Sequence, residues 1–238
     1  MAKNKKWILA AVAVLAVVLC CWAAWSKWAS TTRIGLVNFQ NYQTASLVKS
    51  NEDNFIEYEE IPLDRLDRLG RYDLVLGFGM GLKITEEQRA QILAAADEGT
   101  PIYIYAATNP ENDICSLDSL TKAGISAYIG NGNKRNYRNM ARYVRQHIDA
   151  KRLFVTPAEE AVESASDVLY HLDEDLSFKT VADYEKYLRE QGIYREKAPK
   201  IAIVGGLNDP FSGNRANIDS LIVLLQNLSL IHISEPTR

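Results

Sequence analysis

The sequence predicts an α/β fold with a parallel sheet, preceded by one transmembrane helix. An uncharged apolar run near the amino terminus has the length of a helix that crosses a bilayer. After it, short apolar β-branched runs alternate with segments of helical periodicity. Because parallel neighbours need crossover connections, this alternation favours a parallel sheet covered by helices on both faces.

The apolar run, "WILAAVAVLAVVLCCWAAW", extends from Trp7 to Trp25. A helix rises about 1.5 Å per residue, so this run nearly crosses a hydrocarbon core of about 30 Å. Lysines precede the run, fewer basic residues follow it, and tryptophans flank both ends. This pattern favours a cytoplasmic amino terminus. We therefore expect a single-pass inner-membrane protein with a periplasmic body, in which residues 1–28 form a cytoplasmic stub and anchor and residues 7–25 contact the lipid bilayer.

Two alternatives stay open for this segment. The stretch "AAWSKWAS" offers small residues at which a signal peptide could be cleaved. A lipoprotein signal would need a small residue before its cysteine, whereas Leu19 precedes Cys20 and Cys20 precedes Cys21. The third cysteine, Cys115, has no evident partner, so the sequence excludes a disulfide scaffold.

The body begins with a predicted flavodoxin-like or Rossmann-like α/β domain over residues 33–155. Thr85 and Gln88 form a capping-box pair that begins its first long helix, and Gly99 ends that helix. The run "DSLTKAGISAYIG" predicts another helix, a stop at Gly124 and a weak fifth strand. The four stronger strands are predicted at Arg33 to Gln40, Asn54 to Ile61, Tyr72 to Gly81 and 101–108, with a helix between the first two.

Three further segments follow this domain. Residues 156–198 are richer in charge and are expected to form a helical connector. A buried strand, a Gly-rich loop and an amphipathic helix then indicate the start of a second, truncated α/β domain over residues 199–227. The final run "LSLIHISEPTR" resembles a translated sequencing adapter, so residues 228–238 are expected to be non-native.

Charge and loop composition limit the ligands that the chain can bind. A formal net charge of -3 and the lack of a binding motif argue against a nucleic-acid partner. Ligands of open α/β sheets gather at the carboxyl ends of the strands, which selects the loops "GFGMG" (Gly77 to Gly81) and "GGLNDPFSGN" (Gly205 to Asn214). Neither loop is a phosphate loop, and tight turning explains the first without function. The second loop region supplies the candidate ligand-binding residues Asn208, Asp209, Asn214 and Arg215.

Four arginines form the other candidate ligand-binding group. Arg135, Arg138, Arg142 and Arg145 follow one another at steps of three, four and three, which lines one face of a helix with guanidinium groups. Such a face could hold substrate propionates, an acidic partner or anionic lipid headgroups, or it could be an ordinary solvated surface.

Metal ligation and catalysis have little support in the sequence. The histidines His147, His171 and His232 have no ligand spacing, although a single axial histidine to a porphyrin metal, His147 or His171, needs none. The carboxylates between Glu159 and Asp175 match no calcium loop and favour a solvated surface. No nucleophile and base can be paired, so no catalytic residue and no metal ligand are predicted.

The stretch "KIAIVGGLNDPFSGNRANIDSLIVLLQ", with "RIGLVNFQNYQ" upstream, resembles the amino-terminal part of the CobN-like family. These proteins are the large subunits of cobaltochelatase and their magnesium-chelatase relatives, and membrane-anchored forms from Bacteroides-type bacteria are the most similar. The matched pattern is a strand, a loop ending near Gly213 and a helix with family-like residues at Asn217, Ile218, Asp219, Leu221, Ile222 and Leu225. The resemblance covers residues 33–226 and implies an amino-terminal fragment of a far longer protein.

The resemblance implies ATP-dependent insertion of cobalt into a corrin precursor for cobalamin biosynthesis, with ATP hydrolysed by separate AAA-type subunits. A body outside the cytoplasm would lack ATP, which favours an alternative, the removal of metal from haem alongside haem-uptake proteins. A third hypothesis, of a different class, is an anchored binding module without chemistry that holds a partner on the face from Arg135 to Arg145.

Overall fold

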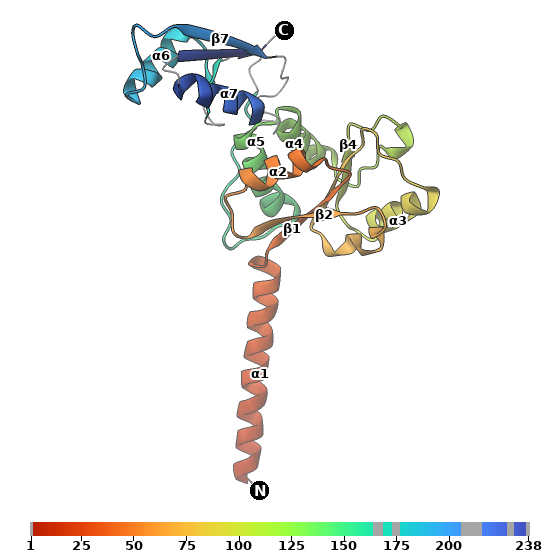
Figure 1. The fold of residues 1–238 in the computed structure, drawn as a ribbon. Coiled ribbons are helices and arrows are strands. Elements are labelled where there is room, and N and C mark those ends of the chain that lie inside the picture. The colour runs from red at the N-terminus through yellow and green to blue at the C-terminus, as the bar shows by residue number, and fades with distance from the viewer. Residues whose placement is uncertain (1, 164–168, 173–176, 206–215, 228–230, 237–238) are drawn as a thin grey trace.

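A computed structural model describes residues 2–163, 169–172, 177–205, 216–227 and 231–236 of the chain. A long helix, α1 (Ala2–Trp28), projects from an α/β domain. A second, smaller sheet lies on the opposite side of that domain from the helix (Figure 1).

Helix α1 corrects the membrane prediction. Within the described residues, no helix is both long and apolar enough to cross a bilayer. The prediction of a single-pass inner-membrane protein with a periplasmic body is therefore wrong, and the bilayer contact through residues 7–25 is not supported.

The first sheet confirms the predicted parallel architecture. Its four strands lie in the order β2-β1-β3-β4, and every neighbouring pair is parallel. Each of the four stronger predicted strands is present. The strands are β1 (Thr32–Val37), β2 (Ile56–Ile61), β3 (Leu74–Phe78) and β4 (Ile102–Tyr105).

Helices cover both faces of this sheet (Figure 1). Side chains alternate along each strand, so Leu74 and Leu76 face one helix layer while Val75 faces the other. The first layer contains α2 (Asn41–Ser50), α4 (Ser119–Gly130) and α5 (Lys134–Tyr143), and the second contains α3 (Glu86–Asp97) and the 3₁₀ helix η1 (Leu66–Arg71). The result is a three-layer domain with one apolar core on each side of the sheet.

Helix α3 begins and ends where the sequence predicts. The Thr85 hydroxyl accepts a hydrogen bond from the Gln88 backbone N–H at 3.2 Å, and the Gln88 side chain accepts one from the Thr85 N–H at 2.9 Å. Gly99, with φ 97°, follows the helix in the left-handed region that glycine tolerates. The predicted capping box is confirmed.

Helix α4 contradicts two sequence predictions. It runs without interruption through Gly124, and no fifth strand follows that glycine; instead Ile125 and Tyr128 continue the buried stripe of the helix. A Cβ at Gly124 would lie 2.8 Å from the Tyr143 ring. The glycine therefore allows α5 to approach α4 closely, and it does not stop the helix.

Asp118 caps helix α4 and makes one end of the domain sensitive to pH. Its carboxylate accepts hydrogen bonds from the Thr121 hydroxyl at 2.6 Å and from the Leu120 and Thr121 N–H groups at 3.0 Å. These hydrogen bonds, led by the one from the Thr121 side chain, lower the pKa of Asp118 below the ordinary 3.8.

A lowered pKa in the folded state means that the cap stabilises the helix above the unfolded pKa of about 3.9 and that this contribution is lost as pH falls through the folded pKa. We expect a carboxyl NMR titration of Asp118 to have its midpoint below 3.8. Asp118→Asn should abolish this part of the acid dependence, and an ordinary midpoint for Asp118 would contradict the cap.

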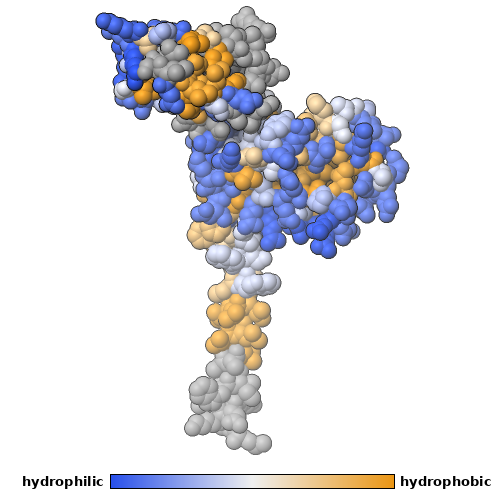
Figure 2. Space-filling view, viewed as in Figure 1, coloured by the Kyte–Doolittle hydropathy of each residue, from blue (hydrophilic) through white to orange (hydrophobic). Residues whose placement is uncertain are grey.

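The carboxyl end of α1 is fixed to the domain by backbone hydrogen bonds. The Trp28 carbonyl accepts from the N–H groups of Arg152 and Leu153 at 3.2 and 2.9 Å, and the Ser26 carbonyl accepts from the Lys151 ammonium at 3.3 Å. Figure 2 shows the described hydrophobic side chains of α1 standing clear of the domain. Among the described residues of α1, these contacts lie at its carboxyl end.

A second sheet forms beyond the first domain, in the order β6-β5-β8-β7. Strands β7 and β8 are parallel, whereas β5 is antiparallel to both of its neighbours. Its elements are β5 (Leu169–Tyr170), β6 (Ser177–Phe178), α6 (Val181–Glu190), β7 (Lys200–Gly205), α7 (Ala216–Asn227) and β8 (Ile231–Pro236). A truncated second α/β domain over residues 199–227 remains a prediction, as do the connector and the non-native tail.

Candidate functional site

The carboxyl ends of the parallel strands are the natural binding edge of the first domain. The chain passes from β1 to β2 on one side and then returns to β3 on the other side of β1. The strand order therefore reverses between β1 and β3, and open α/β sheets bind ligands outside the carboxyl ends of strands at such a point.

Asn38 occupies this switch point. It follows β1 with φ 59°, a conformation that asparagine adopts more readily than most residues. Its side-chain amide donates to the Phe78 carbonyl at 2.7 Å and to the Met80 carbonyl at 3.3 Å. Asn38 thus joins the ends of β1 and β3 and fixes the "GFGMG" loop.

An aromatic cluster lies beside Asn38. The rings of Phe39, Phe78 and Tyr105 have centroids 5.5 to 6.3 Å apart and are mutually tilted, and Tyr103 extends the cluster at 6.2 Å from Tyr105. Burial raises the pKa of the Tyr105 phenol well above its usual value. This hydroxyl therefore stays protonated near neutral pH, and the cluster offers ring faces rather than a base.

A hollow of about 470 Å³ opens at the carboxyl ends of β1 and β2. Its volume falls within the range of about 300 to 1,000 Å³ that is typical of small-molecule sites. One carboxylate, that of Glu60, stands among otherwise uncharged side chains, so the hollow is better suited to binding than to acid–base chemistry. It is lined by Leu36, Asn38, Phe39, Glu60, Ile61, Pro62 and Leu63.

The predicted arginine face is largely occupied by partners within the chain. Arg135 makes two contacts with Glu159, at 2.8 and 3.0 Å, and lowers the pKa of that carboxyl. Arg138 pairs with Glu52 at 2.9 Å. Arg142 is half-buried, and its Nε atom has no hydrogen-bond partner among the described residues. The sequence prediction missed these acidic partners because they come from distant segments.

Arg145 does not belong to that face, since it is completely buried. The chain leaves α5 through a π-helical turn, η3 (Val144–Ile148), which shifts the side chain out of the regular helical register. The guanidinium donates to the Thr32 hydroxyl at 2.9 Å and to five backbone carbonyls between 2.9 and 3.5 Å, those of Ala29, Ser30, Phe55, Leu153 and Phe154. Arg145 is a structural residue and cannot contact a ligand.

His147 and His171 lie beside aromatic side chains. His147 is exposed, and its ring lies 4.5 Å from that of Tyr143. His171 is buried, with Nδ1 2.9 Å from the Tyr184 hydroxyl. Across the described residues, no group of three or more His, Cys, Asp and Glu side chains could hold a metal ion. The candidate residues Asn208, Asp209, Asn214 and Arg215 lie outside the described residues.

Comparison with known proteins agrees with the resemblance seen in the sequence. Residues 126–234 match the family model described as CobN/Magnesium Chelatase. This part of the chain is CobN-like. The match begins inside α4, extends through α7 and ends within β8, so it covers residues 200–226, the main stretch of the sequence resemblance.

The chain also matches a solved structure, the catalytic subunit of cobaltochelatase from Mycobacterium tuberculosis, with a TM-score of 0.55 at 15% sequence identity. The alignment covers 86% of this chain but only 16% of that subunit. At this identity the match establishes a shared fold. No curated protein matches the chain.

Proposed function

We propose that this chain is part of the large subunit of a CobN-like cobaltochelatase, which inserts cobalt into a corrin precursor. The match of residues 126–234 to the chelatase family model carries the proposal, and the fold shared with a cobaltochelatase catalytic subunit supports it. By the same family relationship, separate AAA-type subunits supply the energy of ATP hydrolysis.

Within that subunit, the chain contributes a binding module and the remainder supplies the reacting groups. The hollow at the carboxyl ends of β1 and β2 contains one carboxylate and no paired nucleophile or base. The aromatic cluster of Phe39, Phe78, Tyr103 and Tyr105 beside it offers ring faces that suit a flat macrocycle. The chain corresponds to 16% of the length of the matched subunit, which leaves most of such a protein for the chemistry.

The observations that favoured the two alternatives, removal of metal from haem and an anchored binding module, are not supported by the structure. Removal of metal from haem was favoured by a body placed outside the cytoplasm, and the structure does not support the anchor on which that placement depended. A scaffold that holds its partner on the arginine face is also disfavoured, because Arg135 and Arg138 already have carboxylate partners within the chain.

The test is an absorbance titration of the complete subunit with a cobalt-free corrin and, separately, with haem. We expect the corrin spectrum to shift and to saturate at one corrin per subunit. Haem serves as the comparison ligand. Saturation at a fixed stoichiometry distinguishes specific binding from adsorption of a tetrapyrrole to the exposed apolar side chains of α1, which would not saturate in this way. If neither spectrum shifts, the proposal is wrong, and a haem-only shift would favour the alternative reaction.

A further inference from the structure

The segment "LDRLDRLGR" (Leu63 to Arg71) contains a repeat with a period of three residues. Leucines occupy positions 63, 66 and 69, and arginines occupy positions 65, 68 and 71. A period of three matches neither an α-helix nor a strand, but it matches the 3.0 residues per turn of a 3₁₀ helix. In that conformation all the leucines share one face and all the arginines share another.

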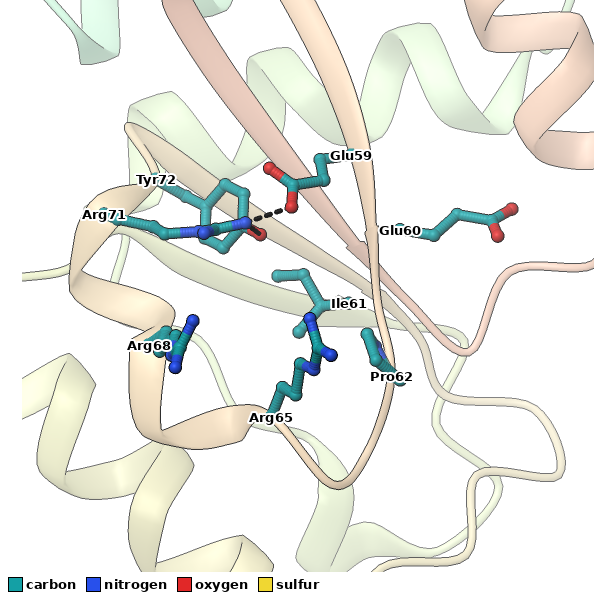
Figure 3. Close-up of a pocket in the computed structure, with 8 residues that line it drawn as sticks. All are labelled: Glu59, Glu60, Ile61, Pro62, Arg65, Arg68, Arg71 and Tyr72. Atoms are coloured by element: carbon teal, nitrogen blue, oxygen red, sulfur yellow. Dashed lines mark hydrogen bonds and ion pairs between the residues drawn. The ribbon is translucent and has the colours of Figure 1, made fainter.

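In the structure, the leucines and the arginines of this repeat lie on different sides of the segment. Leu66 and Leu69 of η1 are buried in the core beneath the sheet, which fixes the short helix on the domain. The backbone kinks at Arg68, with φ -118° and ψ 20°. Figure 3 shows Arg65, Arg68 and Arg71 nonetheless directed toward one pocket beside the end of β2.

This pocket is small, with a volume of about 40 Å³. A single water needs about 10 to 15 Å³ by the same measure, so the space suits one small oxyanion group rather than a large ligand. Glu59 points into it, whereas Glu60 points away on the other side of the strand (Figure 3). Glu59, Glu60, Ile61, Pro62, Arg65, Arg68, Arg71 and Tyr72 line it.

The charges of the pocket are only partly compensated. Arg71 is paired with Glu59 and also donates to the Tyr72 hydroxyl at 2.8 Å, so its guanidinium is fixed. Arg68 has only a contact of 3.7 Å with Asp67, and both side chains are more than 60% exposed, so this pair is weak. Arg65 has no side-chain partner among the described residues. Two positive charges therefore remain for a ligand.

We propose that this pocket binds a phosphoryl group, a tetrahedral dianion whose charge balances Arg65 and Arg68. Guanidinium groups present planar pairs of donors that bind phosphate oxygens bidentately, and Arg71, held in place by Glu59, supplies a third set of donors. The site lies on η1 and the edge strand β2, apart from the residues matched by the chelatase family model, and its failure would not affect the proposed function.

The test is calorimetric titration of the full chain with inorganic phosphate and with glycerol phosphate, at low ionic strength. We expect saturable binding of one phosphoryl group per chain. Tighter binding of inorganic phosphate would identify the free anion as the ligand, and tighter binding of glycerol phosphate would identify a phosphate monoester. Tighter binding of succinate, a dianion with two separate carboxylates, would overturn the assignment of a phosphoryl group.

Two variants locate the binding in this pocket. Arg65→Gln with Arg68→Gln should weaken phosphate binding about tenfold or more, because two charge-assisted contacts are lost. The matched control, Arg33→Gln with Arg152→Gln, removes the same charge from exposed positions elsewhere and should bind like the unmodified chain. Equal weakening in the control, or no saturable heat with the unmodified chain, would refute the site.

Glu59→Gln provides a test in the opposite direction. Glutamine can still accept a hydrogen bond from Arg71 but carries no charge, so this variant removes a negative charge from the pocket and should bind phosphate more tightly than the unmodified chain. A misfolded variant could not produce that gain. Unchanged or weaker binding by Glu59→Gln would contradict the arrangement of charges proposed for the pocket.

Discussion

Replacing Arg145 by methionine is expected to lower the free energy of unfolding of the domain by about 3 to 5 kcal/mol, the effect of removing one partner from a buried charged network. The guanidinium joins the end of α1, the start of β1, the residue before β2 and the loop after η3 through its carbonyl contacts. Methionine has similar length but no donor, so these buried carbonyl groups would lose their hydrogen bonds.

The same substitution removes a positive charge from a group of buried ionisable side chains. The Thr32 hydroxyl, which accepts from Arg145, donates to Asp149 at 2.5 Å, and Asp149 pairs with Lys151 at 2.9 Å. Arg145→Lys should also be destabilising, because an ammonium group is a compact point charge that cannot reach carbonyls on several sides as the guanidinium fork does.

Urea denaturation followed by circular dichroism measures this effect, and Arg135→Met is the matched control. Arg135 lies on α5, which directly precedes η3, but its pair with Glu159 is about half exposed, so its loss should cost about 1 kcal/mol or less. Similar denaturation midpoints for the two variants would show that the buried network contributes no more than a surface ion pair.

Gly79→Ala is the second substitution with a large expected effect, a destabilisation of about 1 to 3 kcal/mol from overpacking. A Cβ at this position would lie 2.6 Å from the Cα and 2.8 Å from the backbone nitrogen of Ala107. Because these are backbone atoms, the ends of β3 and β4 would have to separate. The hydrogen bond from the Gly79 N–H to the Tyr105 carbonyl, 2.7 Å long, would be strained in the same movement.

This change should also be visible in the aromatic cluster. Phe78 precedes Gly79, and its ring lies 5.5 Å from that of Tyr105, so separation of the loops should reduce the near-ultraviolet circular dichroism signal. Gly130→Ala is the control, because no atom within 4 Å opposes a Cβ at the end of α4 and alanine favours helix. A Gly79→Ala chain as stable as this control would contradict the close approach.

The fold of the first domain was predictable because local signals and tertiary packing agree there. The apolar runs of β1, β3 and β4 are largely buried on both faces, and the Thr85 capping box forms with neighbouring residues alone. The predictions failed where packing between distant elements decides the structure. Gly124 predicts a stop by composition, but α5 contacts it, and the π-helical turn that buries Arg145 has no signal in helical periodicity.

The binding edge was predictable only in outline. The rule for parallel sheets selected the "GFGMG" loop correctly as a strand end, but the contact that fixes this loop comes from Asn38, forty residues away in sequence. Glu52 and Glu159 likewise reach the arginine face from distant segments. The arginine pocket did have a local signal, the period of three in "LDRLDRLGR", which a search limited to α-helical and β-strand periods overlooks.

The attachment of α1 affects how force passes through the molecule. The Trp28 carbonyl of α1 accepts hydrogen bonds from the segment after η3. Arg145 donates to the Ala29 and Ser30 carbonyls in the linker between the helix and β1. Because these hydrogen bonds hold both sides of the junction, we expect the helix and the sheet to turn together as one rigid body. Torque applied to the helix would then reorient the binding edge at the opposite end of the strands.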